Sequence, residues 1–318
     1  APAPVFSPNR GRPPMTRPGA PLTLRQQQTR AGLLFVLPWV ISLLVFTAYP
    51  VLATAWYSFT EYNVIEPPRW IGLANYRQML AGDPAFWLAL KNSAIFALIS
   101  VPLKIVLALG LALLLNQALR GIGFYRTVFY LPALVPPVAA PIVFMLLLSP
   151  RGGPVNMLLA RVGIDAPDWF NDPLWAKPAL ILLALWPLGV ETLTFLAGLK
   201  DIPQDLIEAS QLDGANAWQR FWGVILPLLT PVLLFNLIIG IIGSFQVFTQ
   251  ALVIGGVNGE PLESTLMFVV LIYRNAFRYF SMGYAAALSV VLFLLVLALS
   301  LAVLRTSRFW VHYAGESR

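Results

Sequence analysis

Six mainly apolar stretches of about 20 residues or more account for most of this chain. They run over residues 33–56, 93–115, 127–148, 179–199, 222–247 and 284–304. An α-helix of about 20 residues rises about 30 Å, the thickness of the hydrocarbon core of a bilayer. The stretches therefore predict six transmembrane helices. Prolines inside them predict kinks at Pro38, Pro50, Pro102, Pro136, Pro187 and Pro231.

The composition supports the same fold class. Of 318 residues, 58% are hydrophobic and 11% are charged, whereas soluble domains carry about 25% charged residues. No soluble fold buries so much apolar surface, so lipid must solvate it. We expect an all-α polytopic membrane protein. The chain has no cysteine and a single histidine, His312, so we expect no metal site, no catalytic residue and no enzymatic activity.

The placement of Lys and Arg predicts the orientation. With the N-terminus in the cytoplasm, the whole excess of positive charge falls on the inner connections and tails, and the outer connections are neutral. Both termini are then cytoplasmic. Anionic lipid accounts for the basic charge, and no nucleic-acid partner is needed.

The sequence predicts three segments along the chain. Residues 1–30 are rich in Pro and Arg and predict a disordered basic cytoplasmic tail. The membrane domain covers residues 31–305 and contains an inner loop at 200–222. Residues 306–318 form a C-terminal cytoplasmic tail. Residues 264–273 are apolar but too short to span, which predicts an interfacial or partly re-entrant helix.

The inner loop 200–222 predicts a helix–turn–helix. Asp201 is expected as the N-terminal acceptor of its first helix, with Pro203 in the first turn. Leu206, Ala209 and Leu212 share one face of that helix. Asp213-Gly214 is expected to end it, because glycine accepts the positive φ of a helix cap.

A second short helix, residues 215–225, is expected to return the chain to the bilayer, so that the loop lies parallel to the membrane. The loop then has an apolar ridge and an acidic edge formed by Asp205 and Glu208. That shape suits a groove on a soluble partner. An amphipathic loop lying on lipid is the alternative, although anionic headgroups repel the acids.

The spacing of this loop resembles a known motif. The EAA loop of bacterial ABC importer permeases has Glu-Ala-Ala, three residues, Gly, nine residues, Ile, one residue and Leu-Pro. This chain has Glu208-Ala209-Ser210, Gly214, Val224 and Leu226-Pro227 at that spacing. The segments "LAGLKDIPQDLIEASQLDGA", "FYRTVFYLPAL" and "RYFSMGYAAALS" are similar to the carbohydrate-uptake, MalF/UgpA-like branch. The resemblance covers residues 33 to about 305.

The resemblance implies an importer of several subunits. A solute-binding protein would deliver a sugar or glycerol-phosphate-like solute to this chain and a second permease in the bacterial inner membrane. Two ATP-binding subunits would bind ATP and Mg, since this chain has no Walker-type sequence. The residues implied in ATPase coupling are Glu208, Ala209, Ser210, Leu212, Asp213 and Gly214.

Two charged residues lie inside the predicted spans. Glu191 costs roughly 2.5–3.5 kcal/mol at the bilayer centre on insertion scales, so it should face protein or water. At helical spacing it shares a face with Thr194 and Phe195. Glu191 is expected either to accept hydrogen bonds from solute hydroxyls or to make a structural contact, an interhelical hydrogen bond or a pair with Lys104, and these alternatives remain open.

The fifth span also carries polar groups. Asn236, Gly240 and Ser244 follow at i, i+4 spacing and predict either a helix-packing stripe or the edge of a translocation path. Gln246, between Phe245 and Phe248, is the expected solute contact, because aromatic faces suit sugar C–H surfaces and an amide suits hydroxyls.

An ion- or proton-coupled secondary transporter using Glu191 and Lys104 is the alternative function. It would not need a docking loop of fixed spacing.

Overall fold

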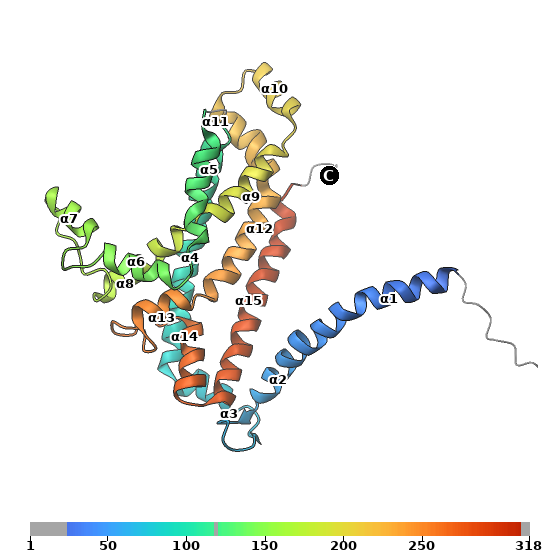
Figure 1. The fold of residues 1–318 in the computed structure, drawn as a ribbon, viewed down its shortest axis with the longest axis vertical. Helices are drawn as coiled ribbons and strands as arrows, with labels where there is room; N and C mark the ends of the chain where they lie inside the picture. Colours follow the sequence, from blue (N-terminus) through green and yellow to red (C-terminus); the bar gives the residue numbers. More distant parts are fainter. Residues whose placement is uncertain (1–23, 118–119, 313–318) are drawn as a thin grey trace, which may run out of the picture. The chain divides into compact units, whose positions relative to one another are not determined.

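The computed structural model describes residues 24–117 and 120–312, and these are almost entirely helical (Figure 1). The α-helices are α1 (Leu24–Ser42), α2 (Tyr49–Tyr57), α3 (Ala74–Arg77), α4 (Pro84–Leu115), α5 (Ile122–Tyr130), α6 (Ala139–Leu147), α7 (Pro154–Arg161), α8 (Pro173–Leu185), α9 (Gly189–Lys200), α10 (Gln204–Leu212), α11 (Ala217–Arg220), α12 (Leu226–Phe245), α13 (Thr249–Gly255), α14 (Phe268–Tyr273) and α15 (Met282–Trp310). Two short antiparallel strands, β1 (Thr60–Glu61) and β2 (Arg69–Trp70), form a hairpin.

The chain divides into two units, the first ending at Ala53 and the second beginning at Thr54. In the first unit, α1 leads through a π-helical turn (Leu43–Ala48) into α2. Together they supply a candidate span, Gly32–Tyr57, with no buried side chain in its most apolar part. Helix α1 begins at Leu24, inside the range expected to be a disordered tail, because the polar residues 24–30 extend the helix of the first span. Residues 1–23 and 313–318 of the two expected tails lie outside the described part.

The prediction of six spans is consistent with the structure, although two of the spans are broken. Four helices are long and apolar enough to cross a membrane: Gly32–Tyr57, Pro84–Leu115, Ala217–Gly255 and Met282–Trp310. The other two candidates are pairs of helices bent at a short break. A membrane protein tolerates such breaks where neighbouring protein satisfies the freed backbone groups.

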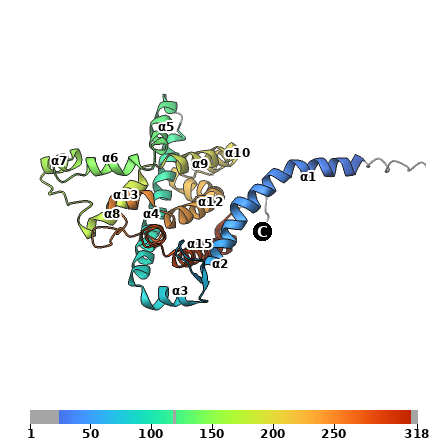
Figure 2. The ribbon, with the colours of Figure 1, turned by 60° about the horizontal axis from the view of Figure 1, so that its bottom comes forward.

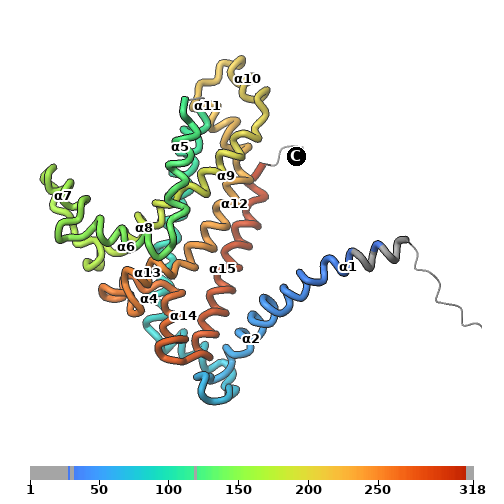
Figure 3. The backbone as a smooth tube through the Cα atoms, viewed as in Figure 1, coloured from blue at the N-terminus to red at the C-terminus, as the bar shows by residue number. Residues whose placement is uncertain are grey.

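The third span is bent by 103° at the break that contains Pro136, a larger change of direction than the kink that the sequence predicted (Figure 3). Helix α5 passes through a 3-10 turn, Leu131–Leu134, and Val135 is extended. Pro136 follows Val135, and a residue before proline is disfavoured in helical conformation. The fourth span is bent by 47° between α8 and α9, next to Pro187.

Helix α4 is central to the second unit, where it packs against α8, α9, α12 and α14. One core cluster joins it to α9 and α12, and Ala108 and Ala112 leave room there for the fully buried Phe195. Gly240 of α12 also meets α4, since a Cβ on it would lie 2.9 Å from Val101. Small residues at helix contacts are the usual means of close packing in lipid.

Residues 264–273 are buried within the second core cluster. Phe268, Val270 and Leu271 of α14 are fully buried among side chains of α4 and α15. Ser93 and Asn92 of α4 hold the preceding chain through the Phe268 N–H and the Leu266 carbonyl. Of the two forms expected for this segment, a helix spread on an interface is therefore not observed. Burial among the helices suits the re-entrant form.

Gly283, in the first turn of α15, sets the contact between that helix and the hairpin. A Cβ on Gly283 would collide with the Thr60 carbonyl oxygen, and its N–H donates to the Tyr62 carbonyl at 3.1 Å. Only glycine allows this close approach of two backbones.

We predict that Gly283→Ala destabilises the protein by about 1–3 kcal/mol, the usual cost of overpacking. The matched control is Gly110→Ala in α4, where an added Cβ meets nothing within 4 Å. Thermal unfolding in detergent should show a lower melting temperature for Gly283→Ala and an unchanged or slightly higher one for Gly110→Ala. Equal melting temperatures for the two variants would contradict the prediction.

Candidate coupling and translocation sites

Helix α10 (Gln204–Leu212) begins after Pro203, whose backbone is extended and whose side chain makes no cap. Asp201 is therefore not the N-terminal acceptor that the sequence predicted. It is instead the C-cap of α9, where its N–H donates to the Ala197 carbonyl at 3.1 Å. Pro203 disfavours a helical residue before it, so the new helix can begin only after it.

The C-terminal end of α10 is the turn that the sequence predicted. Asp213 is the C-cap and Gly214 has φ +81°. The Ala215 N–H donates to the Ser210 carbonyl at 3.0 Å, and the Gly214 N–H donates to the Gln211 carbonyl at 3.0 Å. These bonds satisfy carbonyls that the helix end leaves free, so the turn has a defined geometry.

Helix α10 is attached by one side and exposed on the other. Ile202 is buried, and Ile207 packs against the cluster that joins α4, α9 and α12. Leu206 is 45% exposed and Leu212 is 90% exposed. Glu208, Ala209 and Asp213 are also exposed. The apolar ridge and acidic edge are therefore free within this chain, while the two isoleucines fix the helix to the core.

The second arm of the loop differs from the expected short helix parallel to the membrane. Helix α11 starts at a capping box, in which Asn216 and Gln219 each accept from the other's backbone N–H. It then continues through a π-helical turn, Phe221–Ile225, into α12. Residues Ala217–Gly255 thus form one long candidate span. The turn precedes Pro227, which has no N–H to continue the α-helical bonding pattern.

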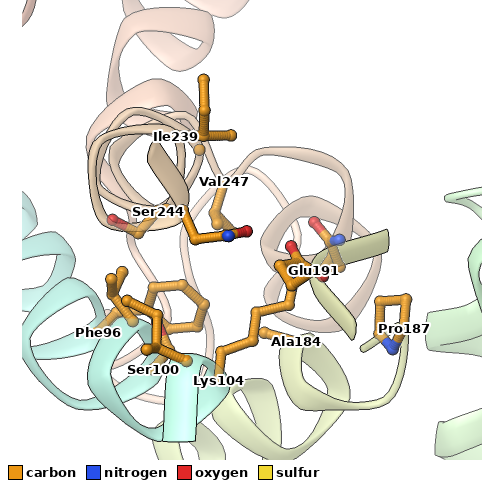
Figure 4. Close-up of a pocket in the computed structure, with 15 residues that line it drawn as sticks. Phe96, Ser100, Lys104, Ala184, Pro187, Glu191, Ile239, Ser244 and Val247 are labelled. Atoms are coloured by element: carbon orange, nitrogen blue, oxygen red, sulfur yellow. Dashed lines mark ion pairs between the residues drawn. The ribbon is translucent and has the colours of Figure 1, made fainter. Parts of the chain in front are cut away.

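A cavity of about 260 Å³ lies between α4, α12 and the ends of α8 and α9 (Figure 4). Its wall is mostly apolar. The polar side chains that line it are Ser100, Lys104, Glu191, Asn236, Ser244 and Gln250.

Lys104 and Glu191 point toward each other in this cavity (Figure 4). Lys104 Nζ lies 2.7 Å from Glu191 Oε1, and the two side chains are 26% and 22% exposed. Glu191 Oε2 is buried and has no hydrogen-bond partner among the described residues. The pairing expected as one role of Glu191 is thus observed. The carboxylate also lines the cavity.

Asn236 and Ser244 line the same cavity and bond to their own helix. Asn236 Nδ2 donates to the Val232 carbonyl at 2.9 Å, and Ser244 Oγ donates to the Ile241 carbonyl at 2.8 Å. Gly240, one turn from each, packs against Val101. Helix packing, one of the two roles expected for this stripe, is therefore observed at Gly240, and its neighbours Asn236 and Ser244 line the cavity.

Most of the predicted path residues lie elsewhere. Phe195 is fully buried in the cluster of α4, α9 and α12, and Phe245 is buried in the other cluster. Thr194 Oγ1 donates to the Val190 carbonyl of its own helix. None of the three lines the cavity. In α9, Phe195 faces the core because Glu191, one turn earlier, occupies the edge of that face.

Gln246 and Phe248 are also placed apart from Glu191. Gln246 is exposed and lines a second, apolar cavity between α12, α14 and α15. Phe248 packs against Tyr273, with ring centroids 5.2 Å apart. Helix α12 ends at Phe245, and Phe248 has φ −128°. Because the helix is interrupted here, helical spacing does not predict which of these residues share a face.

The cavity residues Ser100 and Gln250 were missed by sequence reasoning. Ser100 precedes Lys104 by one helical turn, and this polar pair in an apolar span was a usable signal. Gln250 follows the helix break, so no helical projection from α12 could place it beside Glu191.

The fold and these sites define a class: a polytopic helical membrane protein with an exposed, capped docking helix. The family described as "Binding-protein-dependent transport system inner membrane component" matches residues 104–308. The probable ABC transporter permease protein YesP of Bacillus subtilis is 40% identical over 307 residues, which cover 95% of this chain and 99% of YesP.

Two further comparisons agree. The trehalose/maltose permease protein MalF of Thermococcus litoralis is 33% identical, over 90% of this chain and 96% of MalF. A crystal structure of a bacterial ABC transporter involved in the import of the acidic polysaccharide alginate matches with a TM-score of 0.76 and 25% identity, over 90% of this chain and 98% of that chain. The chain belongs to this family and is a permease subunit of a binding-protein-dependent ABC importer. Membership implies a binding protein and an ATPase as partners, and places this multi-pass protein in the inner membrane.

We predict that Lys104→Met leaves Glu191 without its counter-charge and destabilises the protein by about 1–3 kcal/mol, less than for a fully buried pair. The double variant Lys104→Met/Glu191→Leu should recover most of that loss. Lys200→Met, at the exposed end of α9, is the control and should change stability by less than about 0.5 kcal/mol. Thermal unfolding of the wild type and the three variants measures the loss and its recovery, and an equal loss in Lys104→Met and the double variant would contradict the prediction.

Proposed function

We propose that this chain forms half of the translocation path for a sugar-like solute and receives mechanical force through α10. The observation that carries the proposal is the exposed face of α10, with Glu208 and Gly214 at the motif spacing and the exposed Leu212 between them. The names of two relatives, the MalF protein above and the lactose permease protein LacF of Rhizobium radiobacter, at 37% identity over 85% of this chain, support a carbohydrate solute.

The coupling path runs from α10 into the core. A separate ATPase, holding ATP and Mg, would grip the surface made by Glu208, Ala209, Ser210, Leu212, Asp213 and Gly214. Ile202 and Ile207 connect α10 to α4, α9 and α12. A displacement of α10 therefore reaches the helices around the Lys104–Glu191 cavity. Packed helices transmit such a displacement because they do not deform continuously.

The distribution of Lys and Arg indicates which end of the second unit faces the cytoplasm. The start of α5, α10 with α11, and the C-terminal end of α15 lie at one end of the second unit (Figure 1). The connections at that end carry the excess of Lys and Arg, which supports a cytoplasmic location for them and for both termini. A second permease subunit, in a heterodimer, would complete the path.

The cavity is suited to a solute rich in hydroxyl groups. The charges of Lys104 and Glu191 cancel, and the Gln250 amide in the cavity wall can both accept and donate hydrogen bonds. The surrounding wall is apolar, so hydrogen bonds to a hydroxyl there would be strong. Neutral saccharides and polyols therefore fit this half of the path better than glycerol phosphates.

We predict that Glu208→Lys and Gly214→Val uncouple ATP hydrolysis from uptake without preventing insertion. The first reverses a charge on the docking edge. The second places a β-branched residue at φ +81°, which strains the cap. Gly123→Val is the control, because Gly123 has no positive φ and open space around it.

In proteoliposomes of the complete importer, ATPase stimulation by the loaded binding protein should fall at least 10-fold in both variants and persist in the control. Unchanged stimulation in Glu208→Lys would remove α10 from the mechanism.

Membership of the importer family argues against the alternative expected from the sequence, a proton-coupled transporter using Glu191 and Lys104, although the two side chains do form a 2.7 Å pair in the cavity. Uptake by the reconstituted importer should require ATP inside the vesicle and should survive a protonophore. Uptake driven by a pH gradient in the absence of ATP would reverse this assignment.

A further inference from the structure

The hairpin formed by β1 and β2 lies at the end of the second unit opposite α10, near α3 (Figures 1 and 2). Thr60 pairs with Trp70 and Glu61 with Arg69. Only two residues of each strand pair, and isolated hairpins of this kind are marginally stable. Contacts to the rest of the unit must therefore hold it.

Those contacts are numerous and specific. The buried Asn75 side chain donates to the Ser58 and Thr60 carbonyls, both at 2.9 Å. The Tyr76 hydroxyl donates to Ser58 Oγ at 2.7 Å, and the Gly283 N–H donates to the Tyr62 carbonyl. The base of the hairpin is thus bonded to both α3 and α15.

Aromatic rings stiffen the two strands. The rings of Phe59 and Trp70 stack across the hairpin with centroids 5.4 Å apart, and those of Tyr57 and Tyr62 stack at 4.9 Å. Such stacked pairs stabilise the structure beyond the area that they bury. The hairpin is therefore a rigid projection.

Its tip is both ordered and apolar. Asn63 Oδ1 accepts from the backbone N–H groups of Ile65 and Glu66, at 3.2 and 2.8 Å. Val64 has φ +72°, a region that β-branched residues rarely adopt. Val64 is 53% exposed and Ile65 is 89% exposed. The tip thus combines a strained backbone at Val64 with two exposed aliphatic side chains.

A polar notch lies beside the tip. Its cavity of about 500 Å³ is lined by Glu61, Asn63, Glu66, Pro67, Pro68 and Arg69. Glu61 pairs with Arg69, and Glu66 makes no ion pair within the described residues. The notch therefore carries one uncompensated negative charge next to the aliphatic tip, an arrangement that complements an apolar patch bordered by a Lys or Arg.

We propose that the hairpin tip, residues 63–68, docks onto the extracytoplasmic solute-binding protein, at an apolar patch flanked by a basic side chain. This docking proposal rests on the proposed function, in which the end of the unit that carries the hairpin lies on the extracytoplasmic side of the membrane. A lipid surface fits less well, because the uncompensated charge of Glu66 is repelled by anionic headgroups. A second copy of the chain fits less well too, because a two-fold contact at the tip would bring like charges together.

The absence of cysteine in the sequence allows a clean test. Ile65→Cys carries an environment-sensitive fluorophore in the complete importer, reconstituted in nanodiscs of phosphatidylethanolamine and phosphatidylglycerol. Val162→Cys, an aliphatic residue 71% exposed at the end of α7, carries the same label as the control. The probe is the solute-binding protein that activates the ATPase of the unlabelled importer.

We expect the Ile65 label to be water-exposed alone and shielded on addition of the binding protein, with no change at the Val162 label. A lipid-buried Ile65 label before addition would overturn the proposal in favour of a membrane anchor. A label that stays water-exposed at saturating, activating binding protein would overturn it outright.

A second measurement uses unlabelled variants. In Ile65→Asp and in Glu66→Lys, the binding-protein concentration for half-maximal ATPase stimulation should rise about 10-fold or more with unchanged maximal rate, as for the loss of an interface anchor. Val162→Asp should match the wild type. Unaltered half-maximal concentrations in both tip variants would overturn the docking role alone. Absence of stimulation in the wild-type importer would overturn the proposed function and the docking role with it.

Discussion

The close packing of α4 against α9 and α12 is the contact on which the rest of the second unit depends. Ala108 and Ala112 make room for Phe195, and Gly240 meets Val101. In lipid there is no hydrophobic force between helices, so shape complementarity of this kind must hold them together. The same three helices bound the cavity with the Lys104–Glu191 pair, and they also receive the two isoleucines that attach α10.

Attachment on one side and exposure on the other make α10 suitable for transmitting force. The helix is short, with a defined cap at Gly214 and a capping box at the start of the next helix. The following arm does not lie on the membrane as an independent helix, as expected, but continues into the fifth span. Because no flexible joint separates the loop from the span, a push on α10 and α11 acts directly on α12.

The two ends of the second unit are built in a similar way. At each end a small element is fixed to the core, by the buried Ile202 and the half-buried Ile207 at one end and by the buried Asn75 at the other. Each element presents exposed aliphatic side chains beside carboxylates. Exposed apolar residues that are held rigidly save the entropy that a flexible segment would lose on binding. At both ends this preorganisation favours contacts with proteins rather than with lipid.

The sequence alone determined the spans and the spacing and turn of the loop 200–222, and it predicted the orientation in the membrane. Hydropathy and charge act over about 20 neighbouring residues, and a glycine cap depends on only a few. Which side chains meet in the cavity was decided only by the tertiary structure. Glu191 and Lys104 were expected as one possible pair, whereas Phe195 and Phe245 turned into the core and Gln250 took the place expected for Gln246. The physical reason is that helical spacing holds only while the helix continues. The break after Phe245 and the approach of helices distant in the chain depend on contacts that no local pattern contains.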